Sequence, residues 1–312
     1  MRRSVHRLAL LVASLALLCV ATGCPEDQAT PPGSLEVPRD VEIVQGPVCM
    51  ESVESSAGVV RPQVRRCEDD ERGAIGLVTN QESDRVSVID FARDMQGDPQ
   101  RRPRPVDLDA STPGMTGMKV GAKPVEVAAA GTVGYSVEQT DRALSVINLW
   151  VLDPLSESIT FDSAPTEAVV TPETDESDAH LAVALPDPAR LWVHEHLDCD
   201  FPEEASDGVV DRGAASADEG CSQVPAQEDG TSLELPGRVA DVHASPEGGR
   251  LFIAYRDTNF ASVVALDDEA IGDGECRDGD SAPCEVERVG LTFDCSNDVD
   301  DDGDGDIDED DP

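Results

Sequence analysis

Positive charge is what this sequence most lacks. Among its 312 residues there are 65 acidic side chains and only 23 basic ones, so the formal net charge is −42. A chain this acidic repels phosphate backbones, which excludes nucleic acid as a partner. It also excludes attachment to anionic lipid through a basic patch, so any attachment to a membrane needs another mechanism.

Aromatic residues and helical heptads are scarce as well. Only 3% of the residues are aromatic, whereas glycine (25) and proline (22) are frequent. This composition is unlike that of helix bundles and coiled coils, and it predicts a loop-rich, all-β extracellular protein. The sequence contains no GxSxG motif, no Gly-rich phosphate loop and no HExxH motif, so it offers no familiar catalytic signature.

Residues 1–23 have the layout of an export signal. A basic start is followed by an apolar run from Leu8 to Ala21 that is interrupted by a single serine. The run is too short for a membrane-spanning helix, which needs about 20 residues, but it suits the core of a secretory signal. The sequence ATGC, which ends at Cys24, resembles a bacterial lipobox. An ordinary signal peptide with Cys24 in a disulfide is the alternative.

The lipobox resemblance implies that Cys24 is acylated and that the membrane is a partner through its lipid. Residues 24–40 then form a flexible tether, because they are polar, rich in proline and without apolar periodicity. The residue after Cys24 is Pro25 and not the aspartate that, by resemblance to enterobacterial lipoproteins, marks retention at the inner membrane. We therefore expect an outer-membrane lipoprotein that faces the periplasm or the exterior.

Of the nine cysteines, Cys19 leaves with the leader and Cys24 carries lipid, so seven remain. An exported chain meets an oxidising compartment, and these cysteines are therefore expected to form disulfides. Pairing of sequence neighbours gives three bridges and leaves Cys295 over, although the sequence alone does not fix the connectivity. The three expected pairs are Cys49 with Cys67, Cys199 with Cys221, and Cys276 with Cys284. No CxxC pair is present, so a zinc site is not expected.

Internal repetition predicts the architecture. The segment Gly76–Asp90 recurs 58 positions later as Gly134–Asn148, and both copies contain a strand, a polar turn with Asp-Arg and a second strand. A second match aligns residues 184–193 with residues 244–253. The segment Arg250–Tyr255 is apolar on both faces and is therefore expected to be covered on both. A unit of this kind cannot bury both faces alone, so neighbouring copies must cover it.

The repeated unit resembles that of the YVTN family of β-propellers. The most similar copy is Val78-Thr79-Asn80 with Val86–Asp90, and the resemblance covers about residues 73–270. It implies an all-β propeller over residues 41–290, built here of about four visible repeats of about 58 residues. A full-length relative would have seven blades. A β-sandwich with chance similarity is the alternative, because sandwiches also use short strands and turns.

An Asp-rich segment, residues 291–312, closes the chain. From Asp300 onward it matches the EF-hand loop, with Gly305 at the sharp turn and Ile307 at the apolar position. The residues expected to bind calcium are Asp300, Asp302, Asp304, Asp306, Asp308 and Asp311. The loop resembles those of thrombospondin type-3 and dockerin modules, whereas a disordered acidic tail is the alternative.

The segment from Cys295 to Pro312 also resembles an insert of bacterial surface lipoproteins that would continue with Gly-Cys. This resemblance implies a C-terminally truncated reading frame. Truncation would account both for the unpaired Cys295 and for the small number of blades.

Few residues are candidates for chemistry. His194 and His196, two positions apart on a strand, would share one face, but no third metal ligand is identifiable and a solvated loop is the preferred interpretation. Asp90, Asn148 and Asp267 end equivalent strands and are expected to hold turns.

The sequence thus predicts a lipid-anchored propeller that binds an unknown protein or glycan, or scaffolds the cell surface, with a calcium-binding loop and no catalysis. The alternative is a lactonase-like hydrolase with a metal and carboxylate site in the propeller funnel. Clustered carboxylates and histidines along the funnel would favour the enzyme, and a bland funnel would favour binding.

Overall fold

The computed structural model describes residues 38–54, 60–68, 73–91, 104–106, 108, 117–174, 178–202, 209–210, 216–267, 276 and 282–290. The predicted leader, Cys24, most of the tether, Cys295 and all six predicted calcium ligands lie outside these residues. Within the described ranges, no helix is long and apolar enough to cross a membrane.

Four antiparallel sheets follow one another along the chain. The first contains β1 (Pro38–Gly46), β4 (Gly73–Asn80), β5 (Arg85–Asp90), β6 (Arg104–Pro105) and β7 (Gly117–Lys119). The second contains β8 (Pro124–Ala130), β9 (Val133–Glu138), β10 (Ala143–Asn148) and β11 (Asp153–Thr160). The third contains β12 (Glu167–Val170), β13 (His180–Pro186), β14 (Ala189–Glu195) and β16 (Thr231–Glu234). The fourth contains β17 (Val239–Ala244), β18 (Arg250–Tyr255), β19 (Phe260–Ala265) and β20 (Cys284–Gly290).

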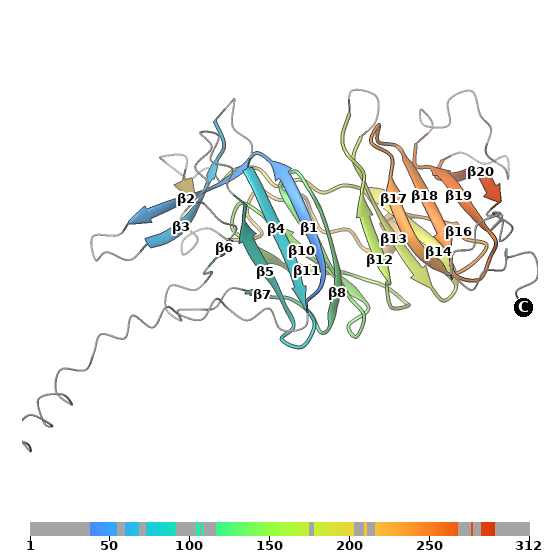
Figure 1. The fold of residues 1–312 in the computed structure, drawn as a ribbon, viewed down its shortest axis with the longest axis horizontal. Helices are drawn as coiled ribbons and strands as arrows, with labels where there is room; N and C mark the ends of the chain where they lie inside the picture. The colour runs from blue at the N-terminus through green and yellow to red at the C-terminus, as the bar shows by residue number, and fades with distance from the viewer. Residues whose placement is uncertain are drawn as a thin grey trace, which may run out of the picture.

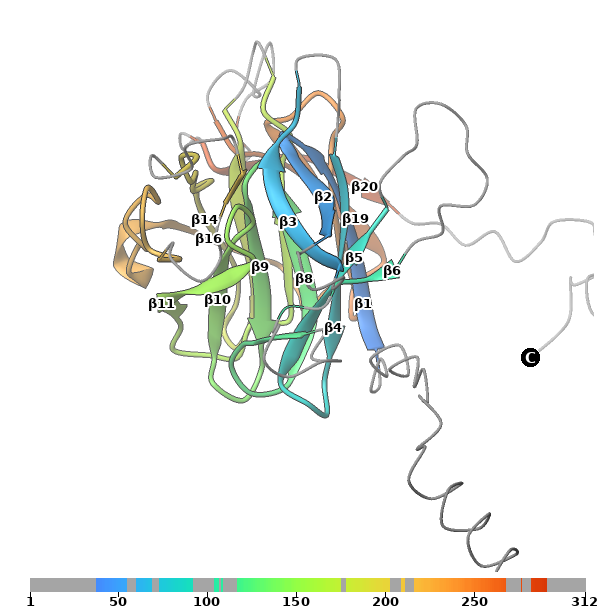
Figure 2. The ribbon, with the colours of Figure 1, turned by 90° about the vertical axis from the view of Figure 1, so that its left-hand side faces the viewer.

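These sheets are four blades of a β-propeller. Their first strands, β1, β8, β12 and β17, contact one another in turn and form the inner wall. In Figure 1 the first blade extends to the left of this wall and the fourth to the right. Figure 2, turned by 90°, shows the second blade running away from the inner strands to one side. The blades therefore fan out in an arc, and the predicted all-β propeller with four visible copies is confirmed.

A smaller sheet joins the arc at the first blade. It consists of β15 (Val209–Val210), β3 (Val60–Arg66) and β2 (Val48–Glu54), and the hairpin of β2 and β3 stands out at the left of Figure 1. The only helical turn in the described residues is a short 3₁₀ segment, η1 (Gln227–Asp229).

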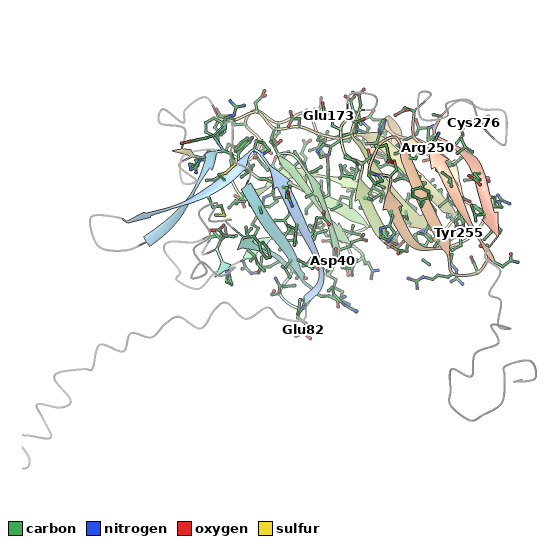
Figure 3. All side chains as sticks on the ribbon, turned by 45° about the horizontal axis from the view of Figure 1, so that its top comes forward. Asp40, Glu82, Glu173, Arg250, Tyr255 and Cys276 are labelled. Carbon is green, nitrogen blue, oxygen red and sulfur yellow. A yellow bond between two sulfur atoms is a disulfide. The ribbon has the colours of Figure 1, made fainter. Side chains whose placement is uncertain are left out.

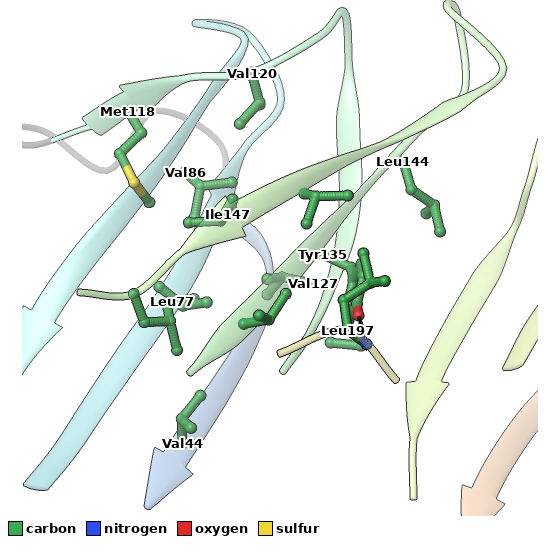
Figure 4. Close-up of a cluster of buried hydrophobic side chains, with 14 of the residues drawn as sticks. Val44, Leu77, Val86, Met118, Val120, Val127, Tyr135, Leu144, Ile147 and Leu197 are labelled. Atoms are coloured by element: carbon green, nitrogen blue, oxygen red, sulfur yellow. Dashed lines mark hydrogen bonds between the residues drawn. The ribbon is translucent and has the colours of Figure 1, made fainter. Parts of the chain in front are cut away.

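The blades are held together by apolar side chains between neighbouring sheets. All six residues of β9 and all six of β10 are buried, because the second blade is covered on both faces. Figure 4 shows part of this core, where Leu77 and Val86 of the first blade lie near Tyr135 and Ile147 of the second. Burial of this kind contributes about 1.5–3 kcal/mol for each large side chain.

The regular repeat holds for the first two blades and fails in the third. The segments that begin near residues 76, 134 and 250 all form second strands, namely β4, β9 and β18. The segment near residue 190 forms β14, which is a third strand, so the match of residues 184–193 with residues 244–253 is wrong. The cause is a shortened hairpin: the third blade turns from β13 to β14 at Pro186–Ala189 without the longer polar turn of the other blades.

The fourth blade departs from prediction in its burial. In β18, Leu251, Ile253 and Tyr255 are buried against the third blade, whereas Phe252 on the opposite face is 48% exposed. The expectation that Arg250–Tyr255 is covered on both faces is therefore wrong, since only one of the described blades packs against β18.

The expected turn-holding role is confirmed for Asn148. Its side-chain oxygen accepts a hydrogen bond from the Trp150 backbone N–H (2.9 Å), and its amide donates to the Ala217 carbonyl (3.0 Å). The Asp-Arg turns are also held by hydrogen bonds. Asp84 accepts one from the Lys123 N–H, and Asp141 accepts one from the Ala122 N–H. Both turns thereby fix the segment that leads into the second blade.

Candidate functional site

A small cavity of about 250 Å³ lies against the inner strands of all four blades. Its ionisable lining residues are five carboxylic acids and one histidine, with no lysine or arginine: Asp40, Glu42, Glu126, Glu167, Asp241 and His243. The sequence analysis named none of these residues as site residues.

Three of these carboxyls hold adjacent blades together. The Asp40 side chain of β1 accepts a hydrogen bond from the Val127 N–H of β8 (3.0 Å). The Glu126 carboxyl accepts from the backbone of Ala168 on β12, and the Glu167 carboxyl accepts from the backbone of Val242 on β17. We call these three carboxylate–amide contacts the blade clasps.

The blade clasps follow a sequence rule. Each backbone donor directly follows the acidic residue of its own inner strand, so that Val127 follows Glu126 and Val242 follows Asp241. The first three blades each offer one acid to the next blade, and the last three each offer one N–H to the previous blade. This pattern of an acid inside an apolar inner strand is the signal that sequence reasoning missed.

Three of these acids have raised pKa values, and the largest rise is at Glu126, between the first and third blades. Burial, then the Asp40 charge, raises the pKa of Glu42 on the first blade to about 6. Burial and the Glu167 charge raise the pKa of Glu126 on the second blade to about 9. For Glu167 itself, burial and then its hydrogen bond to Asp241 raise the pKa to about 7. Desolvation disfavours the charged form, so Glu126 is neutral at pH 7.

A metal does not fit this arrangement. Among the residues that the structure describes, no group of three or more His, Cys, Asp or Glu side chains converges closely enough to hold an ion. Three of the acids are instead committed to the blade clasps. The metal and carboxylate site that the hydrolase alternative implies is therefore not formed by these side chains.

A larger cavity, of about 870 Å³, lies at the other end of the inner strands. Figure 3 labels one acid of each cavity, Asp40 of the small one and Glu173 of the large one. The ionisable residues that line the large cavity are four acids and one histidine: Glu173, Asp178, Glu195, Asp198 and His196.

His196 supports the wall of the large cavity. One ring nitrogen lies 3.1 Å from the Tyr135 hydroxyl and the other lies 3.2 Å from the Ala130 carbonyl oxygen. The same Tyr135 hydroxyl accepts a hydrogen bond from the Leu197 N–H (3.0 Å). Burial lowers the pKa of His196, which keeps the ring neutral. The solvated-loop interpretation is thus wrong for His196, which links the second and third blades.

His194 does not join His196 in a site. Its ring stacks on Trp192, with 5.7 Å between the ring centroids, and its Nδ1 lies 2.6 Å from the Glu195 carbonyl oxygen.

The three expected disulfides, by contrast, are confirmed as Cys49–Cys67, Cys199–Cys221 and Cys276–Cys284. The Cys199–Cys221 bridge packs on the second blade, where Trp150 donates a hydrogen bond to the Cys199 carbonyl.

No protein-family model and no curated protein sequence matches the chain significantly. Solved structures with a similar fold include a protein from Bacteroides fragilis provisionally named a 6-phosphogluconolactonase, at 11% identity and a TM-score of 0.43 over 78% of this chain. The periplasmic gluconolactonase of Pseudomonas aeruginosa matches at 12% identity and a TM-score of 0.41, over 78% of this chain and 67% of its own. This chain spans 64% of the length of the first of these. Similarity this low says nothing about the chemistry of the chain.

Proposed function

We propose that this protein is a lipid-anchored binding protein whose two axial cavities take cationic groups of a protein partner. One observation carries the proposal: every ionisable side chain that lines either cavity is an acid or a histidine. With a net charge of −42 around them, such cavities concentrate positive charge and repel anions. Lysine and arginine side chains on a partner segment match both this charge and the size of the cavities.

The choice of a protein over a glycan follows from the same charge. A neutral sugar gains nothing from a field of this sign, and an acidic sugar is repelled by it. The acylated Cys24 and the tether of residues 24–40 would hold the propeller at the outer membrane, and the Asp-rich loop would bind calcium.

The binding proposal is tested by isothermal titration calorimetry with trilysine as the probe, and with trialanine and maltotriose as neutral controls. Trilysine is expected to bind, and the double variant Glu173→Gln/Glu195→Gln, in the large cavity, is expected to weaken binding about tenfold. The matched control is Glu157→Gln/Glu228→Gln, which removes two exposed acids outside the cavities. Binding of maltotriose alone, or equal trilysine binding by both double variants, would contradict the proposal.

The anchor has its own test. Wild-type cells should incorporate a palmitate analogue into the protein, and Cys24→Ala should abolish the label. Label that persists in this variant would eliminate the lipid anchor.

The calcium loop is tested in the same full chain by titrating calcium into the wild type and into Asp302→Ala/Asp304→Ala. Loss of calcium uptake in the double variant is expected, because both carboxylates are predicted ligands. Equal uptake by the two proteins would place calcium elsewhere.

Lactone hydrolysis is a second candidate, because the small cavity contains the clustered carboxyls and histidine that were expected to favour an enzyme. A carboxyl with a pKa of about 7, Glu167, is suited to act as a general base at neutral pH. The oxyanion formed during hydrolysis needs positive charge or hydrogen-bond donors, and His243 is the only lining side chain that can carry positive charge. Hydrolysis of gluconolactone above the spontaneous rate, lost in Glu167→Gln, would establish this function in place of binding.

A further inference from the structure

His196 lies in the wall of the large cavity, and its contacts fix which ring nitrogen carries the proton. Its Nε2 lies 3.2 Å from the Ala130 carbonyl oxygen, which can only accept, so Nε2 carries a proton and donates it. The neutral ring then offers Nδ1 as an acceptor, and the Tyr135 hydroxyl, 3.1 Å away, donates to it. The Tyr135 oxygen in turn accepts from the Leu197 N–H. Every donor in this network therefore has an acceptor while the ring is neutral.

A second proton on the ring breaks this network. It binds Nδ1, which then becomes a donor that faces the Tyr135 hydroxyl, because both nitrogens of an imidazolium ring are donors. The hydroxyl loses the acceptor for its own proton, and Tyr135 is fully buried, so bulk solvent does not replace that acceptor. A buried donor without an acceptor is destabilising. Protonation of His196 therefore opposes the contact between the second and third blades at this point.

The charged groups that face His196 are all acids among the described residues that line the large cavity. They belong to the third blade and are Glu173, Asp178, Glu195 and Asp198. Tyr135 is the one titratable group that reaches the ring from the first and second blades in the described ranges. Burial lowers the pKa of His196 more than the Asp198 charge raises it, so the pKa stays below its ordinary value of 6.5. The ring is neutral at pH 7 and gains its charge only in acid.

We infer that His196 is a pH sensor of the large cavity, which holds cationic groups while the ring is neutral and releases them when the ring is protonated. This inference rests on the cation-binding role proposed above. Two effects act in the same direction, since the positive ring repels a bound cation and the wall loses its contact with Tyr135. The Thr132 hydroxyl donates to Asp198 (2.5 Å) without involving the ring, so the two blades stay joined.

Calorimetry with trilysine on the purified full chain tests the release. Between about pH 7 and about pH 5, binding by wild type should weaken about tenfold more than binding by His196→Gln, whose amide keeps a donor and an acceptor but does not titrate. The peptide only gains positive charge over this range, so weaker binding comes from the protein. The acids of the small cavity, such as Glu42 and Glu167, also titrate there, and their part is what remains in His196→Gln.

His194→Gln is the matched control. This histidine lies two residues earlier and outside the lining of the large cavity. The variant removes one titrating ring from the same segment and should keep the pH dependence of the wild type.

Nuclear magnetic resonance tests the sensor on the wild type alone. The ring of His196 should titrate below pH 6.5 while the protein stays folded. Over the same range the Leu197 amide, which donates to Tyr135, should lose protection from hydrogen exchange. The Cys199 amide, which donates to the Thr132 hydroxyl (3.0 Å), should keep its protection. Saturating trilysine should lower the pKa of His196 further, because coupling between two binding events is reciprocal.

The outcomes distinguish this inference from the proposed function. Trilysine binding with the same pH dependence in wild type and His196→Gln would overturn the sensor and leave the binding role intact. The sensor is also wrong if the His196 ring stays neutral until the protein unfolds, or if it titrates without a change at the Leu197 amide. Absence of trilysine binding at either pH would overturn the binding role and, with it, the release.

Discussion

The second and fourth blades contain the same strand order but differ in what covers them. Every residue of β9, the second strand of the second blade, is buried, whereas burial alternates along β18 in the fourth. The inner-strand acids differ in the same way, since Glu126 between two blades has the largest rise in pKa and Glu42 at the end of the arc has a smaller one. The number of neighbouring blades therefore determines packing and, for these two acids, agrees with the difference in pKa.

Truncating one aromatic residue in each of these two blades tests whether they differ in how well they are covered. Tyr135→Ala should lower the free energy of unfolding by about 3–5 kcal/mol, because it empties a fully buried site and removes the hydroxyl that meets Leu197 and His196. Phe252→Ala, at a half-exposed site, should cost less than about 1 kcal/mol. Urea unfolding measures both.

Tyr135→Phe serves as the control for the hydroxyl, since it keeps the ring and removes only the hydrogen bonds. Similar costs for Tyr135→Ala and Phe252→Ala would mean that the fourth blade is as well covered as the second.

The sequence predicted features that depend on a short segment better than features that depend on the neighbouring blades. The strand–turn–strand pattern of Gly76–Asp90 and Gly134–Asn148 predicted the blade and its stacking, because both are properties of a short segment. The shortened hairpin at Pro186–Ala189 shifted the alignment by one strand, since a second and a third strand have the same apolar pattern.

The site was harder to foresee than the fold. Asp40, Glu126 and Glu167 lie far apart in the sequence, and only the arc of blades brings them to one axis. Likewise, Phe252 has the composition of a covered residue, and its exposure follows from the position of its blade at the end of the arc. Features that depend on the global arrangement cannot be read from a local motif.

A second prediction compares disulfides at an interior and an end position. Removing Cys199–Cys221 by paired serine substitutions should cost about 3 kcal/mol, because the bridge closes a loop with a sequence separation of 22. Removing Cys276–Cys284, with a separation of 8, should cost about 1 kcal/mol less. The first bridge also packs on Asn148 and Trp150, so its loss should loosen the junction of the second and third blades.

Hydrogen exchange at the amides of β10 reports that loosening directly, while urea unfolding gives the two free energies. If loss of Cys276–Cys284 also speeds exchange in β10, then the bridge at the end of the arc stabilises the interior blades as well.

A pH-dependent effect is expected from the charge of Glu126. Its pKa is about 9 in the folded protein against an ordinary value of 4.5, so the folded state binds the proton more tightly than the unfolded state. The resulting contribution to stability is fully present below about pH 4.5 and is lost as the pH rises toward about 9. Glu126→Gln keeps an acceptor for the Ala168 N–H and carries no charge, so it should stabilise the protein by a few kcal/mol at pH 8.5 and hardly at all at pH 4.5. Glu42→Gln, at the end of the arc, should give a smaller gain, because the pKa of Glu42 rises only to about 6. Both gains are measured by urea unfolding at pH 8.5. Equal gains from the two substitutions would mean that the pKa of an inner-strand acid does not depend on the number of neighbouring blades, which would then explain the difference in packing alone.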